Sequence, residues 1–137
     1  MHCYLKTQNF LYCFQSGFRQ GFSTDTCLVN LSDSIKSETA NGNFTGMVLI
    51  DLQKAFDCVD HDVLLDKLSS MGVSSTDWFR SYLCDRFQCT QVAGFDSDFL
   101  RVNCGVPQGS ILGPTLFLCY INDMSSGRFR RRPAGFI

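Results

Sequence analysis

Apolar residues recur at the spacing of an amphipathic helix in four stretches of the chain, and most of these stretches have a recognisable start and stop. Serine, threonine or aspartate stands at the first three starts, where such residues act as N-caps, and an Asn-Gly pair or a lone glycine ends the first two. The predicted helices cover residues 23–41, capped by Ser23 or Thr24; 60–72, capped by Asp60 or Asp62; 75–83, opened by Ser75 or Thr76; and 112–121.

Two of these helices make specific demands on their surroundings. In the third, Trp78, Phe79, Tyr82 and Leu83 are spaced to pack inward. In the last, Pro114 is tolerable only near the first turn, because proline lacks the amide hydrogen that a helix interior requires. Residues 1–22 show no steady period, and we expect them to be irregular.

Shorter apolar patterns predict three strands. Residues 47–50 form an unbroken apolar run after Gly46, which favours a strand buried on both faces and ending at Asp51. Residues 87–93 and 99–104 flank a turn at 94–98 and predict a hairpin, whose second strand should be half-buried because apolar and polar residues alternate along it. Helices mixed with an antiparallel sheet give an α/β (α+β) fold class.

Composition narrows the class of protein. With 137 residues, 45% of them hydrophobic and 18% charged, the chain is typical of one small ordered domain. The net charge is -1, yet Arg128, Arg130, Arg131 and Arg132 supply four of the twelve basic residues, so the preceding chain is clearly acidic. A general nucleic-acid clamp would be more basic.

The eight cysteines include no C-x-x-C pair, and no paired histidines stand at zinc-ligand spacing. We interpret the cysteines as buried, reduced thiols. The sequence shows no signal peptide and no apolar run of the ~20 residues that a membrane span needs. We therefore expect an intracellular protein, in the cytoplasm or nucleus, with no membrane association; a secreted disulfide framework is the competing interpretation.

Asp51 is the first candidate for chemistry, because functional carboxylates often stand where a buried strand reaches a cleft. An aspartate after a strand is also a common turn former. A haloacid-type phosphatase would need a second aspartate two residues on, where Gln53 stands, and a response-regulator receiver would need an earlier acidic pair. Both of these alternatives lose most of their support.

Residues 48–61, VLIDLQKAFDCVDH, closely resemble motif A of reverse transcriptases from retrotransposons without long terminal repeats, the LINE-like elements. The resemblance implies that Asp51 is catalytic and a ligand of both metal ions, and that Leu52 and Phe56 bind the nucleotide, with Phe56 under its sugar. Two Mg²⁺ ions need hard oxygen ligands, which fits a carboxylate. Core packing is the alternative for Phe56, and for Asp57 and Asp60 we favour a helix cap or salt bridge.

Residues 105–124, GVPQGSILGPTLFLCYINDM, resemble motif B of the same family almost without departure. The resemblance implies that Gln108 and Gly109 contact the incoming nucleotide or the nascent base pair, and that Pro107 shapes the loop. A glycine- and proline-rich turn that opens a buried helix explains the glycines and apolar residues too, but it does not explain why both motifs occur in one chain.

Residues 15–24, QSGFRQGFST, are similar to the segment that precedes motif A in these polymerases. Arg19 could contact a phosphate or the template, or could brace the fold. The family usually has a basic residue near position 22, where this chain has Phe22. The third family motif, an aromatic-x-Asp-Asp hairpin, does not follow motif B, so we expect a truncated fragment with an incomplete Mg²⁺ site.

The resemblance extends over about residues 8–124 and implies part of the palm and fingers of a right-hand polymerase, with an incomplete antiparallel sheet packed by helices. Residues 1–127 are predicted to be a partial reverse transcriptase domain and 128–137 a basic, unrelated tail. The implied function is RNA-directed DNA polymerase, a nucleotidyltransferase acting on an RNA template, a DNA primer and dNTPs. The alternatives are a non-catalytic remnant that binds nucleic acid or a related polymerase, a relic without function, or an unrelated α/β protein.

Overall fold

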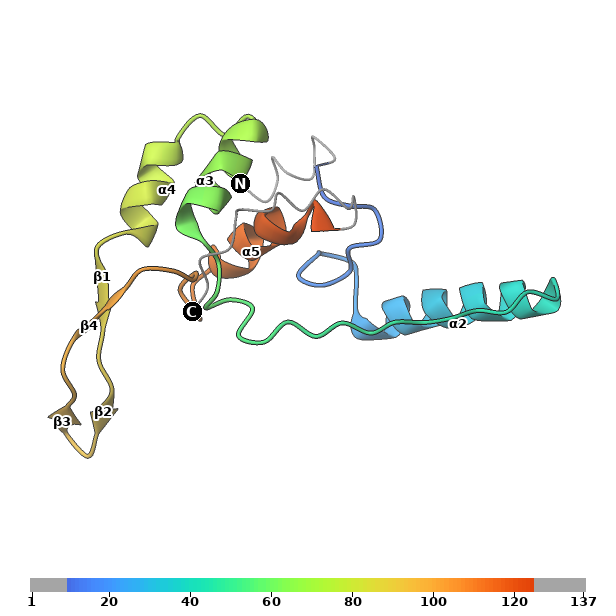
Figure 1. Cartoon of the computed structure of the whole chain (residues 1–137), viewed down its shortest axis with the longest axis horizontal. Coiled ribbons are helices and arrows are strands. Elements are labelled where there is room, and N and C mark those ends of the chain that lie inside the picture. Colours follow the sequence, from blue (N-terminus) through green and yellow to red (C-terminus); the bar gives the residue numbers. More distant parts are fainter. Residues whose placement is uncertain (1–9, 125–137) are drawn as a thin grey trace. The chain divides into compact units, whose positions relative to one another are not determined.

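A computed structural model describes residues 10–124 of the chain (Figure 1). These residues form two compact units, one made of residues 10–12 together with 54–124 and the other of residues 13–53. The arginine-rich tail at 128–137 lies outside the described residues, and so does the Cys3 thiol.

The second unit contains one long helix, α2, Thr24–Ala40. Its start is fixed by a capping box, in which the Ser23 side chain accepts from the Thr26 amide and the Thr26 hydroxyl accepts from the Ser23 amide. Asn41 is the C-cap, and Gly42 follows with a φ of +79°. The predicted helix is therefore confirmed almost to the residue. Within its own unit, however, α2 buries none of its side chains.

Three helices build the core of the first unit: α3, His61–Ser70; α4, Thr76–Leu83; and α5, Gly113–Ile121. α3 packs against both α4 and α5 (Figure 1). Asp60 caps α3 by accepting from the Val63 amide, and Pro114 stands in the first turn of α5, both as predicted. The buried core residues are Val59, Leu64, Leu65, Leu68, Phe79, Leu83, Val106, Leu116, Phe117 and Cys119.

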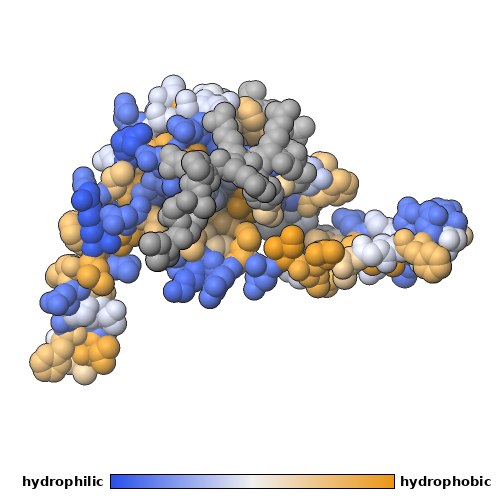
Figure 2. Space-filling view, viewed as in Figure 1, coloured by the Kyte–Doolittle hydropathy of each residue, from blue (hydrophilic) through white to orange (hydrophobic). Residues whose placement is uncertain are grey.

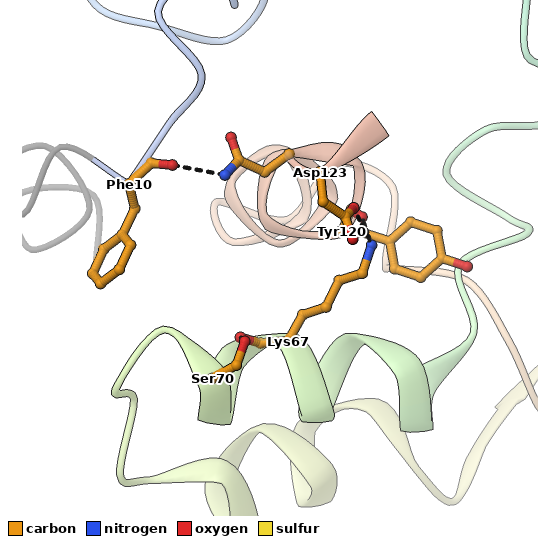
Figure 3. Close-up of polar contacts among 6 residues, drawn as sticks. Phe10, Lys67, Ser70, Tyr120 and Asp123 are labelled. Atoms are coloured by element: carbon orange, nitrogen blue, oxygen red, sulfur yellow. Dashed lines mark hydrogen bonds and ion pairs between the residues drawn. The ribbon is translucent and has the colours of Figure 1, made fainter. Parts of the chain in front are cut away.

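Polar contacts tie α5 to α3 and to the start of the described chain (Figure 3). The Lys67 ammonium donates to the Tyr120 carbonyl and to the Asp123 carboxylate, so a cation satisfies the carbonyl end of α5. The Asn122 side chain donates to the Phe10 carbonyl at 2.6 Å and accepts from the Tyr12 amide at 2.8 Å. One amide side chain thus pairs with backbone more than 100 residues away.

The predicted hairpin forms as two short ladders. β1, Arg86–Gln88, pairs antiparallel with β4, Leu100–Val102, and β2, Gln91–Val92, pairs with β3, Phe95–Asp96. The turn lies at Ala93 and Gly94, and both residues have positive φ, which is typical of a type I′ turn. This two-residue turn is shorter than the turn predicted at 94–98. Between the ladders the returning strand has one residue more than its partner, so the hairpin is bulged.

The hairpin is also more exposed than its alternating pattern indicated. The second strand was expected to bury its apolar side chains, but Leu100 is 66% exposed and Val102 is only partly buried. Figure 2 shows apolar surface over this part of the chain. In α4, Phe79 and Leu83 pack inward as predicted, while Trp78 is 55% exposed and stacks on the Tyr82 ring, so the inward prediction for Trp78 is wrong.

The buried strand predicted at residues 47–50 is also wrong. No strand forms there, and the side chains of Leu49 and Ile50 are 83% and 79% exposed. A strand needs a neighbour to receive its backbone hydrogen bonds, and in the described chain all four strands belong to the hairpin. Asp51 therefore does not end a central strand. The coarser prediction, helices mixed with small antiparallel sheets, is confirmed.

The cysteines differ from the prediction as well. Within residues 10–124 none is in a disulfide, but only Cys119 is buried, and Cys13, Cys27, Cys58, Cys89 and Cys104 are exposed. Most of the exposed cysteines stand on loops, on the hairpin or on α2, and none of them is among the buried core residues. No helix in the described part of the chain is long and apolar enough to cross a membrane.

Candidate functional site

The segment after Asp51 is a tight turn, and its backbone is held by its own hydrogen bonds. The amides of Asp57 and Cys58 both donate to the Lys54 carbonyl, at 2.9 and 3.1 Å. Lys54 adopts a φ of +48°, a conformation that non-glycine residues rarely adopt. Phe56 lies on this turn, and Asp60, the N-cap of α3, follows it.

The loop that precedes α5 is hydrogen-bonded directly to this turn. The Gly105 amide donates to the Val59 carbonyl at 2.7 Å, and the Val106 amide donates to the Phe56 carbonyl at 2.9 Å. Gly105 has a φ of +88°, and a Cβ atom there would lie 2.9 Å from the Asp57 Cα atom. Only glycine permits both the conformation and the close approach. Two segments almost fifty residues apart are therefore joined into one frame.

Side chains reinforce the same junction. The Gln108 amide nitrogen donates to the Asp57 carboxylate at 2.8 Å, with both residues exposed. The His61 Nε2 atom lies 2.8 Å from the Gly105 carbonyl, and His61 is the one polar side chain buried within residues 10–124. A buried polar ring needs such a partner. Each side of the junction thus supplies polar groups to the other.

The glycine-rich loop has an internal frame of its own. The Ser110 hydroxyl donates to the Pro107 carbonyl at 2.8 Å and accepts from the Gly113 amide at 2.9 Å. The Gly113 backbone is so close to the Pro107 carbonyl that a Cβ would lie 2.8 Å from it. Gly109, between them, has a φ of +79° and open space around it. Gln108 and Gly109 are thus presented on the outside of a braced turn.

Phe56 stacks on Phe117 of α5, with ring centroids 4.5 Å apart and planes 28° apart. It is half-buried against the core. The structure therefore supports the packing role for this ring, and one face of it belongs to the protein interior. Any contact with a nucleotide has to use what remains of its surface.

Asp51 and Leu52 are not part of the unit that contains this junction. Both belong to the second unit, in backbone without regular structure, and both are exposed. Within residues 10–124 no three His, Cys, Asp or Glu side chains come together in a group that could hold a metal ion. The described residues therefore do not fit a complete divalent-metal site, although the Asp51 carboxylate is the right kind of ligand for one.

Arg19 also belongs to the second unit, where it braces its own segment. Its guanidinium donates to the Gln15 carbonyl at 3.1 Å and to the Cys13 carbonyl at 3.5 Å. The guanidinium carbon lies 4.6 Å from the centre of the Phe22 ring, within cation–π range. Of the two predicted roles, these contacts favour bracing, and Phe22, the departure from the usual basic residue, supplies the ring.

Two residues of the junction did not stand out in the sequence. Asp57 was interpreted as a helix cap or a salt-bridge partner, but Asp60 caps α3 and Asp57 accepts from Gln108. His61 was noted only as part of the Asp60-His61 pair of motif A. The only sequence signal for Asp57 and His61 was their position within motif A. No local pattern indicates that a residue contacts a loop over 40 residues away.

Known protein families and known proteins that resemble this chain agree with the two motifs. The sequence profile described as "Reverse transcriptase (RNA-dependent DNA polymerase)" matches residues 1–131 of the 137. The chain belongs to the reverse transcriptase family. The predicted resemblance is thereby confirmed, whereas the assignment of palm and fingers has no support from solved structures, because none matches.

Retrotransposon polymerases are among the relatives of this reverse transcriptase chain. It is 36% identical over 116 residues to the probable RNA-directed DNA polymerase from transposon BS of Drosophila melanogaster, covering 80% of the chain and 12% of the relative. It is 33% identical over 112 residues to the polymerase from mobile element jockey of the same species, covering 81% and 12%.

A further relative is the Pol polyprotein from the type-1 retrotransposable element R2 of Popillia japonica, 27% identical over 99 residues and covering 71% and 16%. The chain thus corresponds to between 12% and 16% of the length of these three proteins. The similarity therefore covers only a small part of each whole relative.

Proposed function

We propose that this chain is the part of a LINE-like RNA-directed DNA polymerase that receives the incoming nucleotide, where the palm meets the fingers. The observation that carries the proposal is the junction of motifs A and B, in which Gly105 lies against Asp57 and two backbone hydrogen bonds join the motifs. Residues of both motifs can act on the same nucleotide only if the two segments are held at a fixed distance from each other.

In this proposal Gln108, Gly109, Phe56 and Leu52 bind the dNTP. Gln108 and Gly109 are exposed on the braced loop, which suits a contact with the base pair. Phe56 is fixed by stacking on Phe117, which suits a ring that must reject a 2′-hydroxyl by its position. The substrates of the complete polymerase would be an RNA template, a DNA primer and dNTPs.

Asp51 is proposed as the catalytic carboxylate and as a ligand of Mg²⁺. Mg²⁺ prefers octahedral oxygen ligands and keeps several waters when only one or two carboxylates bind it. Because the described residues form no complete metal site, we propose that the isolated chain is inactive and that further ligands come from other parts of a polymerase. No catalytic step is assigned to the chain alone.

The test compares the isolated chain with a chimaera. In the chimaera, this segment replaces the corresponding segment of the jockey polymerase, and both proteins are assayed for primer extension on an RNA template with Mg²⁺. We expect no extension by the isolated chain and extension by the chimaera, which Asp51→Asn should abolish. Phe56→Val should relax its rejection of ribonucleotides, whereas Phe44→Val, at a fully exposed ring, should not.

Three outcomes would contradict the proposal. Metal-dependent extension by the isolated chain that survives Asp51→Asn would show that the catalytic assignment is wrong. An Asp51→Asn chimaera that extends as fast as its parent would do the same. If the isolated chain and the chimaera are both inactive, while the parent jockey polymerase is active under the same conditions, the segment is better described as a non-catalytic remnant.

A further inference from the structure

The side-chain contact between Asp57 and Gln108 has a consequence for how Gln108 can act. A carboxylate only accepts hydrogen bonds, so the amide group that faces Asp57 has to be the nitrogen. This fixes which way the Gln108 amide is turned. The carbonyl oxygen and the second amide hydrogen remain available to a third group.

The backbone on both sides holds this contact in register. The Phe56 and Val59 carbonyls, on either side of Asp57, accept from the Val106 and Gly105 amides, which precede Gln108 by two and three residues. Gly105 in addition lies against the Asp57 backbone. The backbone segments that carry Asp57 and Gln108 are hydrogen-bonded to each other. The distance between the two side chains is therefore set by this backbone pairing.

Exposure argues that the contact does little for the stability of the fold. Both side chains are open to water, which can replace either partner, and exposed polar pairs of this kind contribute little. Its effect is instead on the conformational freedom of the Gln108 side chain. An unconstrained glutamine side chain loses rotational freedom about several bonds when it binds a ligand, which costs free energy. A side chain that is already oriented avoids part of that cost.

We propose that Asp57 is a positioning residue for nucleotide binding, which orients the Gln108 amide so that its carbonyl oxygen and free N–H meet the hydrogen-bonding groups of the incoming dNTP. This inference rests on the proposed function. Asp57 itself does not touch the nucleotide. It acts on the affinity for dNTP rather than on the chemical step, because it alters only how ready Gln108 is to bind.

A side-chain substitution series in the chimaera tests the inference. Asp57→Leu removes the acceptor and should raise the KM for dNTP by about 3- to 10-fold with little change in kcat. Asp57→Asn keeps an acceptor oxygen of the same size and should stay within about 2-fold of the parent. Asp85→Leu, which removes an exposed carboxylate from an Arg101 pair in the hairpin, is the matched control and should leave KM unchanged.

A donor–acceptor reversal separates positioning from simple bracing of the loop. In the double variant Asp57→Asn with Gln108→Glu, the asparagine can donate to the glutamate, so the link between the segments is restored. We expect the KM for dNTP of this double variant to be higher than that of the parent chimaera, because residue 108 no longer presents an amide. Recovery of the parent KM by this double variant, or an unchanged KM in Asp57→Leu, would overturn the inference.

The contact can also be measured without catalysis, in the 137-residue chain itself. In ¹⁵N-resolved NMR spectra the side-chain amide protons of Gln108 should be well separated and slow to exchange with solvent. Asp57→Leu should collapse this separation, while Asp85→Leu should not. A Gln108 amide that is unaffected by Asp57→Leu overturns the inference whatever the chimaera does, and an inactive parent chimaera contradicts the proposed function instead.

Discussion

At the scale of single residues, Gly105 shows how strongly one position can be determined. It combines a left-handed backbone with a contact to Asp57 that leaves no space for a Cβ atom. Gly109 has a similar φ but no atom near the position of a Cβ. The two glycines therefore share the left-handed backbone and differ only in whether a Cβ atom would overlap with a neighbour. The pair therefore separates backbone strain from steric overlap.

We predict that Gly105→Ala destabilises the chain by about 3 kcal/mol, because it adds overlap with Asp57 to the cost of a left-handed alanine. Gly109→Ala should cost only about 1 kcal/mol, the backbone term. The free energy of unfolding from urea titration measures both. Equal losses in the two variants would show that the packing of Gly105 on Asp57 contributes nothing.

The buried Cys119 thiol should make the stability of the chain depend on pH. Burial raises the pKa of the Cys119 thiol from 9.0 to about 11. The unfolded chain therefore ionises this thiol at lower pH than the folded chain, and the free energy of unfolding should fall as pH rises from 9 towards 11. Cys119→Ala lacks this contribution, so its own decrease over that range should be smaller than that of the parent. Parallel curves would contradict the prediction.

At the scale of elements, the helices differ in how their ends are satisfied. Asp60 accepts from the Val63 amide at the start of α3, whereas Ser75 at the start of α4 makes no capping hydrogen bond with its side chain. Sequence alone suggested both as caps. The structure distinguishes them, because capping depends on the backbone angles before the helix as well as on the residue type.

We predict that Asp60→Ala lowers the free energy of unfolding by about 1 kcal/mol, the usual contribution of a capping side chain. Ser75→Ala is the control and should change it by less than about 0.5 kcal/mol. Thermal and urea unfolding followed by circular dichroism would measure both. If Ser75→Ala costs as much as Asp60→Ala, the capping hydrogen bond is not the cause.

At the scale of the whole molecule, the two units should differ in stability. The apolar core of the described chain lies in α3, α4, α5 and the turns beside them, while α2 buries nothing within its own unit. We predict that amides of α2 exchange with deuterium far faster than those of α3 and α5, by a factor of about 100 or more. Hydrogen exchange with mass spectrometry tests this, and equal protection of α2 and α5 would contradict it.

The exposed run at residues 47–50 leads to a prediction on solubility. Four consecutive exposed apolar residues of strand-forming type are a site for association with other chains. Ile50→Lys should reduce aggregation measured by light scattering, whereas Ile111→Lys, at an exposed isoleucine outside such a run, should reduce it much less. A soluble, monomeric parent with one cooperative melt would contradict this prediction.

The sequence by itself determined the helices, the hairpin and the family. The starts of α2 and α3 follow from Ser23 and Asp60, because caps and helix hydrogen bonds connect residues only a few positions apart. The family follows from two long motifs in one chain. Such signals are local, so they are present before the chain folds.

Only the tertiary structure decided which distant groups meet. The contact of Gln108 with Asp57, the fit of Gly105 against the same residue and the partner of His61 all join segments more than 40 residues apart. The failure of the strand at 47–50 has the same cause, since an apolar run becomes a strand only when another segment lies beside it to receive its hydrogen bonds.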